Sequence, residues 1–271
     1  MPGTLYLVAT PIGNLEDITL RALRLLREAD LIACEDTRQT GKLLAHFGID
    51  KPMTSYHEHN ETARTQEMVA KLEAGANIAL VSDAGTPLVS DPGYRLVTAA
   101  IGARIPVVPI PGTSAVLGAL AAAGLPTDAF RFSGFLPVKS GQRRKALEAL
   151  CGEDCTLIFY EAPHRILETL SDVSVACGNR PVVVARELTK LHEEFLRGTA
   201  DEVGAQLAAR PSVKGEITLL IGKGAPVIAA TPVEDAVREL ERKGIPRMDA
   251  IKQVARERGL SKREVYSKVT G

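Results

Sequence analysis

Residues 80–93 join the end of an apolar run to a turn that contains two Asp, two Ser and one Thr, which are side chains able to hold a ligand. The apolar residues 78–81 predict a strand buried on both faces, and the Asp, Gly and Pro that follow end it. Asp91 and Pro92 then predict the start of a helix, with Asp91 at its N-cap. A strand, turn and helix start at the carboxyl edge of a parallel sheet form a ligand cradle. The same residues also fit an ordinary strand-to-helix connection, although such connections need fewer turn residues.

Short polar segments follow the other predicted strands as well. They are residues 10–14, 35–38, 57–60, 111–114, 161–165 and 187–190. Because the carboxyl ends of parallel strands meet at one edge of a sheet, polar segments that follow such strands are expected to come together there.

The elements that must position these segments alternate along the first part of the chain. Apolar runs predict strands at 5–9, 31–34, 53–56, 78–81 and 105–109, and apolar periodicity predicts helices at 20–28, 61–73 and up to about 101. This alternation predicts a parallel sheet with helices on both faces. A second unit follows Pro126, with predicted strands at 130–135, 156–160, 181–186 and 216–221.

The end of the chain is predicted to be helical. Residues 222–226 read as a linker, and three short helices are predicted beyond it at 233–243, 247–258 and 261–269. Ser261 and Glu264 form a capping box at the start of the third helix.

Composition and charge restrict the classes of protein. The chain has 271 residues, of which 45% are apolar and 24% are charged, as in a soluble globular protein. Lys and Arg together number 33, as do Asp and Glu, so nucleic-acid binding requires local basic patches. No apolar run reaches the ~20 residues of a membrane span. The four cysteines are expected to be thiols of a reducing cytoplasm, because they form no C-x-x-C pair.

Familiar motifs are missing. No strand is followed by G-x-G-x-x-G, Gly41 and Lys42 lack the rest of a P-loop, and there is no G-x-S-x-G elbow. His57, Glu58 and His59 alternate, so that in a strand they point to opposite faces, and we expect no metal site there.

Several longer blocks, taken in order, carry a family resemblance. They are T-P-I-G-N-L-E-D-I-T (10–19), C-E-D-T-R-Q-T-G (34–41), S-Y-H-E-H-N (55–60), V-S-D-A-G-T-P-L-V-S-D-P-G (81–93), P-I-P-G (109–112), F-Y-E-A-P-H-R (159–165), A-R-E-L-T-K (185–190) and K-G-E-I-T-L-L-I (214–221). The chain resembles the bacterial small-subunit ribosomal RNA cytidine 2′-O-methyltransferase I family, which belongs to the tetrapyrrole-methylase superfamily. The resemblance extends from Leu5 to about Val269.

The resemblance implies a fold class and an activity. The fold is α/β, with two tetrapyrrole-methylase-like domains of parallel-rich sheets at 1–113 and 114–225, and a small helical C-terminal appendage at 226–271. The activity is methylation of a cytidine ribose 2′-oxygen in the decoding region of small-subunit rRNA, with S-adenosyl-L-methionine bound between the domains. It also implies a cytoplasmic homodimer that acts on rRNA or on the assembled small ribosomal subunit.

The resemblance also implies where the cofactor binds. The superfamily often has Gly-Asp-Pro where this chain has Gly85, Thr86 and Pro87, and we expect Asp83 to substitute for the missing Asp. The residues expected at the cofactor are Asp83, Ala84, Gly85, Thr86, Pro87, Pro111, Gly112, Thr113, Ser114, Phe159, Tyr160 and Glu161.

Methylation of a ribose hydroxyl calls for a base, or for a cation that stabilises the developing alkoxide. Glu35, Asp36 and Arg38 follow a predicted strand and are the expected catalytic residues, with Asp36 and Arg38 facing the hydroxyl. The same segment equally fits a helix N-terminus at which the acidic side chains interact favourably with the helix dipole.

Two segments carry local positive charge for RNA. Lys139, Arg143, Arg144 and Lys145 form one cluster, and residues 234–271 hold ten Lys and Arg against seven Asp and Glu, a net charge of +3. Residues 255–261 resemble part of a helix-turn-helix, although a solvated charged helix pair explains them too.

The other functions considered are a tetrapyrrole or protein methylase of the same superfamily and a non-catalytic RNA-binding factor in ribosome assembly.

Overall fold

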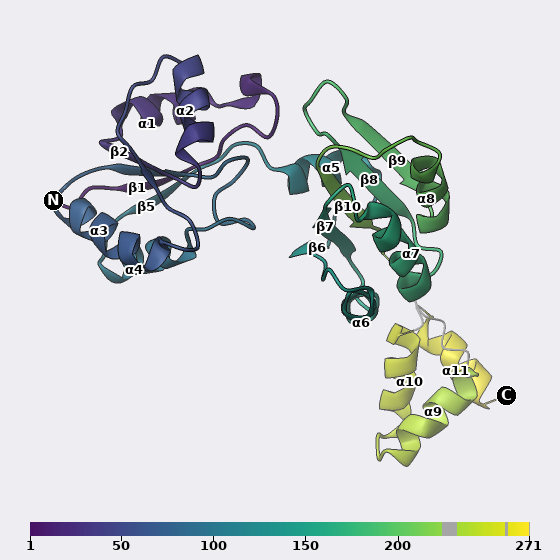
Figure 1. The fold of residues 1–271 in the computed structure, drawn as a ribbon. Coiled ribbons are helices and arrows are strands. Elements are labelled where there is room, and N and C mark those ends of the chain that lie inside the picture. Colours follow the sequence, from purple (N-terminus) through teal and green to yellow (C-terminus); the bar gives the residue numbers. More distant parts are fainter. Residues whose placement is uncertain (224–231, 258–259, 271) are drawn as a thin grey trace.

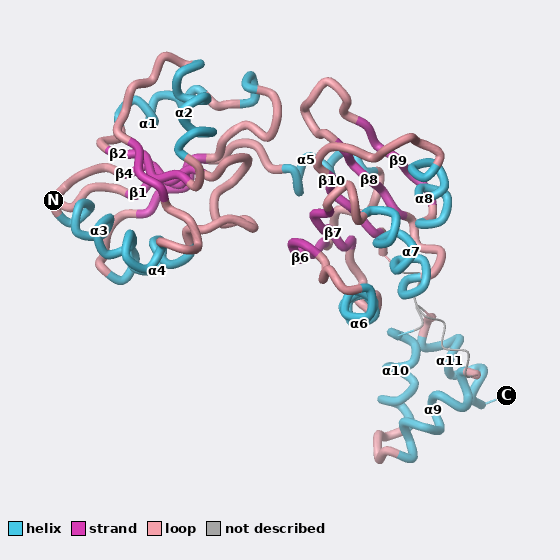
Figure 2. Tube along the Cα trace, viewed as in Figure 1, coloured by secondary structure: helices cyan, strands magenta, loops and turns pink. Residues whose placement is uncertain are grey.

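The computed structural model describes residues 1–223, 232–257 and 260–270. They form two α/β units, each built on a five-stranded sheet, and a third unit of three helices at the C-terminal end (Figure 1). Figure 2 shows the strands of each sheet enclosed by helices. The predicted two-domain fold with a helical appendage is confirmed.

The first sheet is entirely parallel. Its spatial order is β3 (Met53–Ser55), β2 (Leu31–Cys34), β4 (Ile78–Val81), β1 (Leu5–Val8) and β5 (Val107–Ile110). The central strand β4 is buried along its whole length, as its apolar sequence predicts.

Helices cover both faces of the first sheet. One face packs against α1 (Leu20–Glu28) and α2 (Thr37–His46), which contribute Leu26 and Leu44 to the core. The other face packs against α3 (Glu61–Glu73) and α4 (Tyr94–Gly102), which contribute Met68 and Leu96. A short 3₁₀ helix, η1 (Leu15–Asp17), precedes α1.

The order of the strands creates a crevice beside β1 and β4. The chain leaves β1 toward α1 on one face of the sheet and leaves β4 toward α4 on the other face. Because these two strands are neighbours, the connections that follow them diverge at the carboxyl edge, and ligands of open α/β sheets bind at such a point.

The second sheet is mixed rather than parallel-rich, which corrects the sequence prediction. Only β6 and β7 are parallel, and the other three pairings are antiparallel. The spatial order is β6 (Phe130–Phe135), β7 (Thr156–Glu161), β10 (Ile217–Ile221), β8 (Val182–Arg186) and β9 (Glu194–Gly198). The sequence analysis missed β9, an edge strand whose sequence E-F-L-R-G lacks an apolar run.

Four helices enclose the second sheet. The apolar helix α5 (Ala115–Ala123) covers one face. The other face packs against α6 (Ser140–Leu150), α7 (Ile166–Cys177) and α8 (Ala200–Ala208). In Figure 1, α5 lies where the two α/β units meet.

The three C-terminal helices pack around a small core of their own. They are α9 (Val233–Arg242), α10 (Arg247–Glu257) and α11 (Lys262–Thr270), and they agree with the predicted helices to within a residue. The capping box also forms, since the Ser261 N–H donates to Glu264 Oε2 at 2.7 Å. Most of the predicted linker and part of the predicted helix-turn-helix, residues 258–259, lie outside the described residues.

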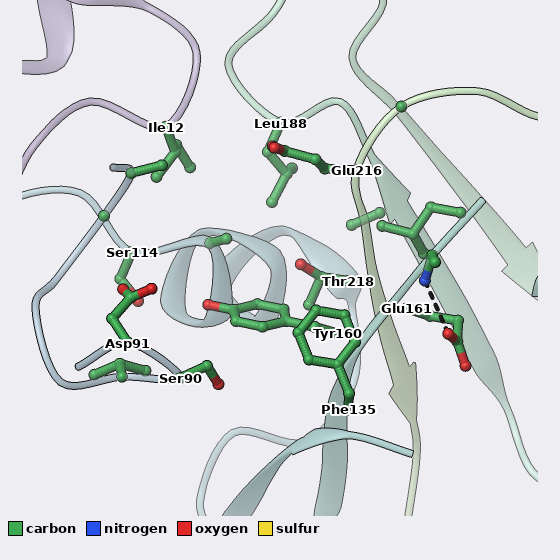
Figure 3. A pocket seen from close by; sticks show the side chains of 18 of the residues that line it. Ile12, Ser90, Asp91, Ser114, Phe135, Tyr160, Glu161, Leu188, Glu216 and Thr218 are labelled. Carbon is green, nitrogen blue, oxygen red and sulfur yellow. Dashed lines mark hydrogen bonds between the residues drawn. The ribbon is translucent and has the colours of Figure 1, made fainter. Parts of the chain in front are cut away.

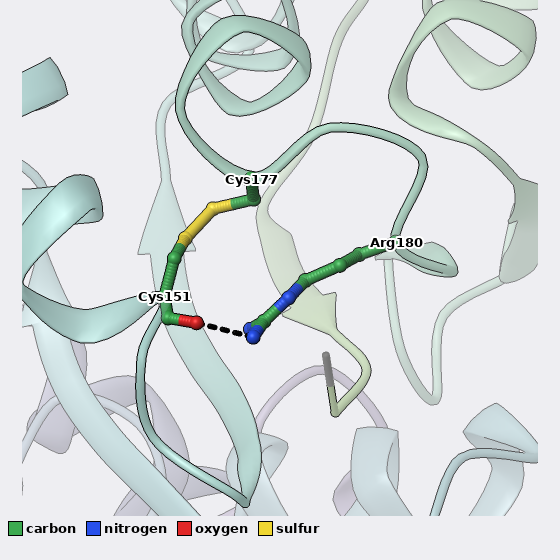
Figure 4. Close-up of a disulfide and its surroundings, with 3 residues drawn as sticks. All are labelled: Cys151, Cys177 and Arg180. Atoms are coloured by element: carbon green, nitrogen blue, oxygen red, sulfur yellow. Dashed lines mark hydrogen bonds between the residues drawn. A yellow bond between two sulfur atoms is a disulfide. The ribbon is translucent and has the colours of Figure 1, made fainter. Parts of the chain in front are cut away.

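Two of the cysteines form a disulfide, which corrects the prediction of thiols. Cys151 follows the end of α6, Cys177 is the last residue of α7, and their Cα atoms are 5.7 Å apart (Figure 4). The Arg180 guanidinium donates to the Cys151 carbonyl beside the bond. No local pattern indicates this pairing, because the packing of α6 against α7 brings together residues 26 positions apart.

No helix in the described part of the chain combines the length and the apolar character that a membrane crossing requires. Residues 1–223, 232–257 and 260–270 also contain no group of three or more His, Cys, Asp or Glu side chains that could hold a metal ion.

Candidate active site

A cavity of about 400 Å³ lies between the carboxyl edge of the first sheet and the second unit. The first unit contributes residues of the loops that follow β1, β4 and β5, and the second unit contributes residues of β6, β7, β8 and β10 with their loops. Figure 3 shows Asp91 and Ser114 on one side of the cavity and Tyr160, Phe135 and Thr218 on the other. Small-molecule sites typically occupy about 300–1,000 Å³ and lie between domains.

Hydrogen bonds hold the three loops of the first unit together. Thr10 and Gly85 exchange backbone hydrogen bonds of 2.9 and 3.0 Å, which join the loops that follow β1 and β4. The Thr10 hydroxyl donates to the Ser82 carbonyl at 3.1 Å. Thr113, which follows β5, donates to the Thr10 carbonyl and accepts at its own carbonyl from Thr86 Oγ1 at 3.1 Å. The three loops therefore form one connected ligand-facing edge.

Two glycines permit this arrangement. Gly85 has a φ of +84°, in the left-handed region that favours glycine. A Cβ on Gly112 would lie 2.8 Å from the Cβ of Ala9, so only glycine allows the loop after β5 to pack this closely on β1.

The loop between β4 and α4 is longer than predicted and carries Asp91 to the cavity. The prediction that Asp91 caps a helix is wrong, because α4 begins at Tyr94 with Gly93 at its N-cap. Leu88 and Ser90 have φ values of +71° and +67°, which turn the chain away from a helical path. The pKa of Asp91 is raised to about 6, mainly by burial and also by the nearby charges of Glu35 and Asp83, and a hydrogen bond with Ser82 opposes the increase.

Strand alternation decides which side chains of β7 face the cavity. Tyr160 points into it, whereas Phe159 packs in the core on the opposite face of the sheet. Glu161 also turns away, because its carboxylate accepts from the Ala162 N–H at 2.8 Å and from Thr169 Oγ1 at 2.7 Å. Burial raises the pKa of the Tyr160 hydroxyl, and the charges of Asp91 and Glu216 add to the increase.

The cavity lining is acidic and apolar. Its acidic side chains are those of Asp91 and of Glu216, which pairs with Lys190 at 3.0 Å, and among the described residues the lining contains no Lys, Arg or His. Its apolar walls include Ile12, Val89, Leu188 and Ile217. The described lining therefore offers no cationic side chain to a phosphate group, although the N-terminus of α5 at Ser114 and Ala115 does face the cavity. Its carboxylates suit a ligand that carries positive charge.

The structure brings half of the predicted cofactor residues to the cavity. Those that line it are Ala84, Gly85, Thr86, Ser114, Tyr160 and Glu161, the last through its backbone. The other six do not line it, and they are Asp83, Pro87, Pro111, Gly112, Thr113 and Phe159. Of these six residues, Gly112 and Thr113 shape the loops that line the cavity. The roles assigned to these residues stay a prediction.

The predicted catalytic residues lie at the carboxyl end of β2, and none of them lines the cavity. Asp36 caps α2, accepting from the Arg38 N–H at 2.8 Å, and its carboxylate also pairs with the Arg38 guanidinium at 2.7 Å. These hydrogen bonds from Arg38 lower the pKa of Asp36 to about 2. The Asp36 N–H donates to Asp83 Oδ1 at 3.1 Å, and burial raises the pKa of Glu35. The geometry fits a helix cap, and the catalytic role stays a prediction.

The sequence analysis missed several cavity residues. They include Ile12, Val89, Ser90, Asp91, Phe135, Leu188, Glu216 and Thr218. Four of the family blocks, 10–19, 81–93, 185–190 and 214–221, contain seven of these eight residues and could have indicated them. Asp91 was not predicted to line the cavity, because an Asp before a Pro is also a common start of a helix.

Comparisons with known proteins agree with this geometry. Residues 4–204 match the family model of the tetrapyrrole (corrin/porphyrin) methylases. The chain is 52% identical over 273 residues to the ribosomal RNA small subunit methyltransferase I of Halalkalibacterium halodurans, covering 98% of this chain and 94% of that protein. It is 51% identical to the protein of the same name from Synechocystis, covering 97% and 96%.

Solved structures share the fold at low sequence identity. The uroporphyrin-III C-methyltransferase of Thermus thermophilus, solved with S-adenosyl homocysteine, aligns with a TM-score of 0.55 at 21% identity, covering 81% of this chain and 97% of that one. A diphthine synthase aligns with a TM-score of 0.62 at 14% identity, covering 81% and 90%. The match to the family model and the extent of the two sequence alignments confirm the resemblance, and the chain belongs to the ribosomal RNA small subunit methyltransferase I family of the tetrapyrrole methylases.

Proposed function

We propose that the protein transfers a methyl group from S-adenosyl-L-methionine to the 2′-oxygen of a cytidine ribose in the decoding region of small-subunit rRNA. The observation that carries the proposal is the cavity between the two α/β units, which is lined by the carboxylates of Asp91 and Glu216, by apolar groups and, in the described part of the chain, by no basic side chain. The names of the curated relatives support rRNA as the class of acceptor.

The cavity fits this methyl donor in size and charge. The donor carries a sulfonium and an ammonium group against one carboxylate, so its net charge complements the carboxylate of Asp91. Glu216 also lines the cavity, where Lys190 already pairs with it at 3.0 Å. Ile12, Val89 and Leu188 offer apolar surface to its adenine ring and aliphatic chain. The backbone at Ala84–Thr86 and at Ser114 would hold it from the first unit.

The bound donor supplies an activated methyl group, whose C–S bond breaks toward sulfur as the new O–C bond forms. The protein contributes position, because holding two reactants in line lowers the barrier by about 7–11 kcal/mol. The connected loops after β1, β4 and β5 provide a rigid edge for this purpose. The half-buried aromatic side chain of Tyr160 helps to keep water out.

The RNA would approach from the cavity mouth with its phosphates against basic surfaces. Lys139 and Lys145 at α6 are exposed and remain candidates, together with Arg144. Arg143 is not a candidate, because its side chain is fully buried and pairs with Asp172 at 2.6 Å. The C-terminal helices with their net positive charge are the second basic surface.

A homodimer is part of the proposal. Helix α5 is apolar on every side, and its outward residues Leu117, Gly118, Ala121 and Ala122 are exposed in a single chain. A helix that is apolar all round is normally buried, so a second copy of the chain covering α5 would remove this exposed surface from water.

The deciding experiment compares rRNA nucleosides, by mass spectrometry, from cells with and without the gene. Loss of 2′-O-methylcytidine from the small subunit, restored by the gene, is the expected result. Unchanged rRNA together with methylation of a tetrapyrrole or a protein would indicate another methylase of the superfamily. A purified protein that shows no binding of the donor in calorimetry but binds small subunits would indicate an assembly factor.

A further inference from the structure

We propose that the carboxylate of Asp91 is the group that accepts the proton of the attacking ribose hydroxyl. This inference rests on the proposed function and names the proton acceptor within the same cavity. It differs from the assignment of that role to Asp36, which the sequence suggested.

The position of Asp91 supports the inference. Its side chain lies on the cavity wall between Ser114 and the hydroxyl end of Tyr160 (Figure 3). Positive φ at Leu88 and Ser90 fixes the loop that carries it. Glu161 has turned its carboxylate into the second unit, and Glu216 lies toward Leu188 on the far side of the cavity. Asp91 is therefore the carboxylate that the first unit presents to the cavity.

The charge balance of the reaction favours a buried carboxylate. The hydroxyl proton passes to Asp91, while the oxygen forms its bond to the methyl carbon and the C–S electron pair stays on sulfur. One negative charge on Asp91 and one positive charge on sulfur disappear in the same step, and no further reactant is needed. Because a cavity of low polarity destabilises both charges, it favours their mutual loss.

The charged groups around Asp91 leave it as a proton acceptor of suitable strength. Glu35 and Asp83 act on it from the edge of the first sheet, and Tyr160 faces it from the second unit. Within residues 1–223, 232–257 and 260–270, no basic side chain lines the cavity to hold Asp91 permanently ionised. Asp36 differs, because Arg38 binds both of its oxygens. A general base works best when its pKa lies near the operating pH.

Binding measurements test the inference without turnover. If Asp91 lies beside the sulfonium, affinity for S-adenosylmethionine should fall about tenfold between pH 7 and pH 5 as Asp91 is protonated. Affinity for S-adenosylhomocysteine, which has the same ammonium but a neutral sulfur, should change much less. In Asp91→Asn the difference between the two ligands should vanish, whereas Asp50→Asn, an exposed control far from the cavity, should behave as the wild type.

Single-turnover methylation of small subunits supplies the second readout. Asp91→Asn should lower the rate by about 10²–10⁴-fold with unchanged S-adenosylhomocysteine affinity, which also shows that the variant is folded. The wild-type rate should rise with pH, with a midpoint near the pKa of Asp91. The Asp36→Asn variant should keep most of the wild-type rate. A full rate in Asp91→Asn, or equal pH dependence for both ligands, would overturn the inference. A wild type that binds neither ligand would instead refute the proposed function.

Discussion

Thr10 and Gly85 exchange two backbone hydrogen bonds, of 2.9 and 3.0 Å, across the crevice between the neighbouring strands β1 and β4. The turn after β4 is therefore shaped by the turn after β1 as well as by its own residues. Since both turns contribute to the cavity wall, a change in either is transmitted to the ligand-facing edge.

Replacing Gly85 with Ala should damage the site and the fold together. The left-handed φ of +84° costs a residue with a Cβ about 1–2 kcal/mol, and that Cβ would lie 3.4 Å from Ile12 Cγ2 in the cavity wall. We expect a lower melting temperature and weaker S-adenosylmethionine binding in calorimetry.

Gly141→Ala is the matched control for Gly85→Ala. It lies in the first turn of α6, its Cβ would meet nothing within 4 Å, and it should be neutral or stabilising. Equal effects of the two substitutions would contradict the importance of the Gly85 conformation.

Asp91→Asn should stabilise the protein at neutral pH. Folding raises the pKa of Asp91 from 3.8 to about 6, so the native state binds this proton more tightly than the unfolded chain. The stabilisation from that proton is complete below about pH 4 and is lost as the pH rises through about 6. The variant, which has no carboxylate to ionise, should exceed the wild type by roughly 1–3 kcal/mol at pH 7.5 and by little at pH 4.

Denaturant unfolding at both pH values measures the difference between Asp91→Asn and the wild type. A variant that is less stable than the wild type at pH 7.5 would mean that the ionised carboxylate has a stabilising partner.

Local sequence signals were sufficient for most elements of the first unit. Helix α1 was predicted with its observed bounds, because Thr19 caps it and leucines mark its buried face. The second sheet was predicted less well, since the direction in which β10 pairs with β7 and β8 depends on residues distant in sequence. The edge strand β9 was not predicted, because charged residues interrupt its apolar pattern.

In the candidate site, too, features set by neighbouring residues could be predicted, and features set by distant contacts could not. The turn at Ala84–Thr86 could be predicted, because its Gly and Thr break a buried strand at the ligand-binding edge. The orientation of Glu161 could not be, because it depends on which face of β7 meets α7, where Thr169 binds the carboxylate. The position of Asp91 depends on the left-handed residues Leu88 and Ser90, which no local rule predicts.

Substitution of Arg143 should lower stability, whereas substitution of Lys145 should weaken RNA binding, although both residues belong to one basic run. Arg143 is fully buried and donates to Asp172 and to the Val138 carbonyl, so Arg143→Ala should cost about 3–5 kcal/mol of stability. Lys145→Ala, at an exposed position, should leave stability within about 0.5 kcal/mol and weaken RNA binding with a shallower salt dependence.

Unfolding curves and RNA titrations at several salt concentrations separate these two roles. If Arg143→Ala were as stable as the wild type and lost RNA affinity, the sequence-based assignment of Arg143 to RNA binding would be restored.

Removal of residues 224–271 should separate RNA binding from donor binding. Helices α9, α10 and α11 pack around a core that, among the described residues, shares no member with the cores of the two sheets, so the truncated chain should fold. Its donor affinity should be unchanged, and its affinity for small subunits should fall, because a net charge of +3 is lost with the helices.

A full-length double variant, Lys262→Gln with Arg263→Gln, is the control for the truncation, because it removes two exposed charges of α11 and keeps the three helices. Calorimetry with the donor and sedimentation with small subunits measure the two affinities. Partial loss of subunit binding in the double variant and a larger loss in the truncation would assign the effect to charge on the helices. Unchanged subunit binding after truncation would show that these helices do not dock RNA.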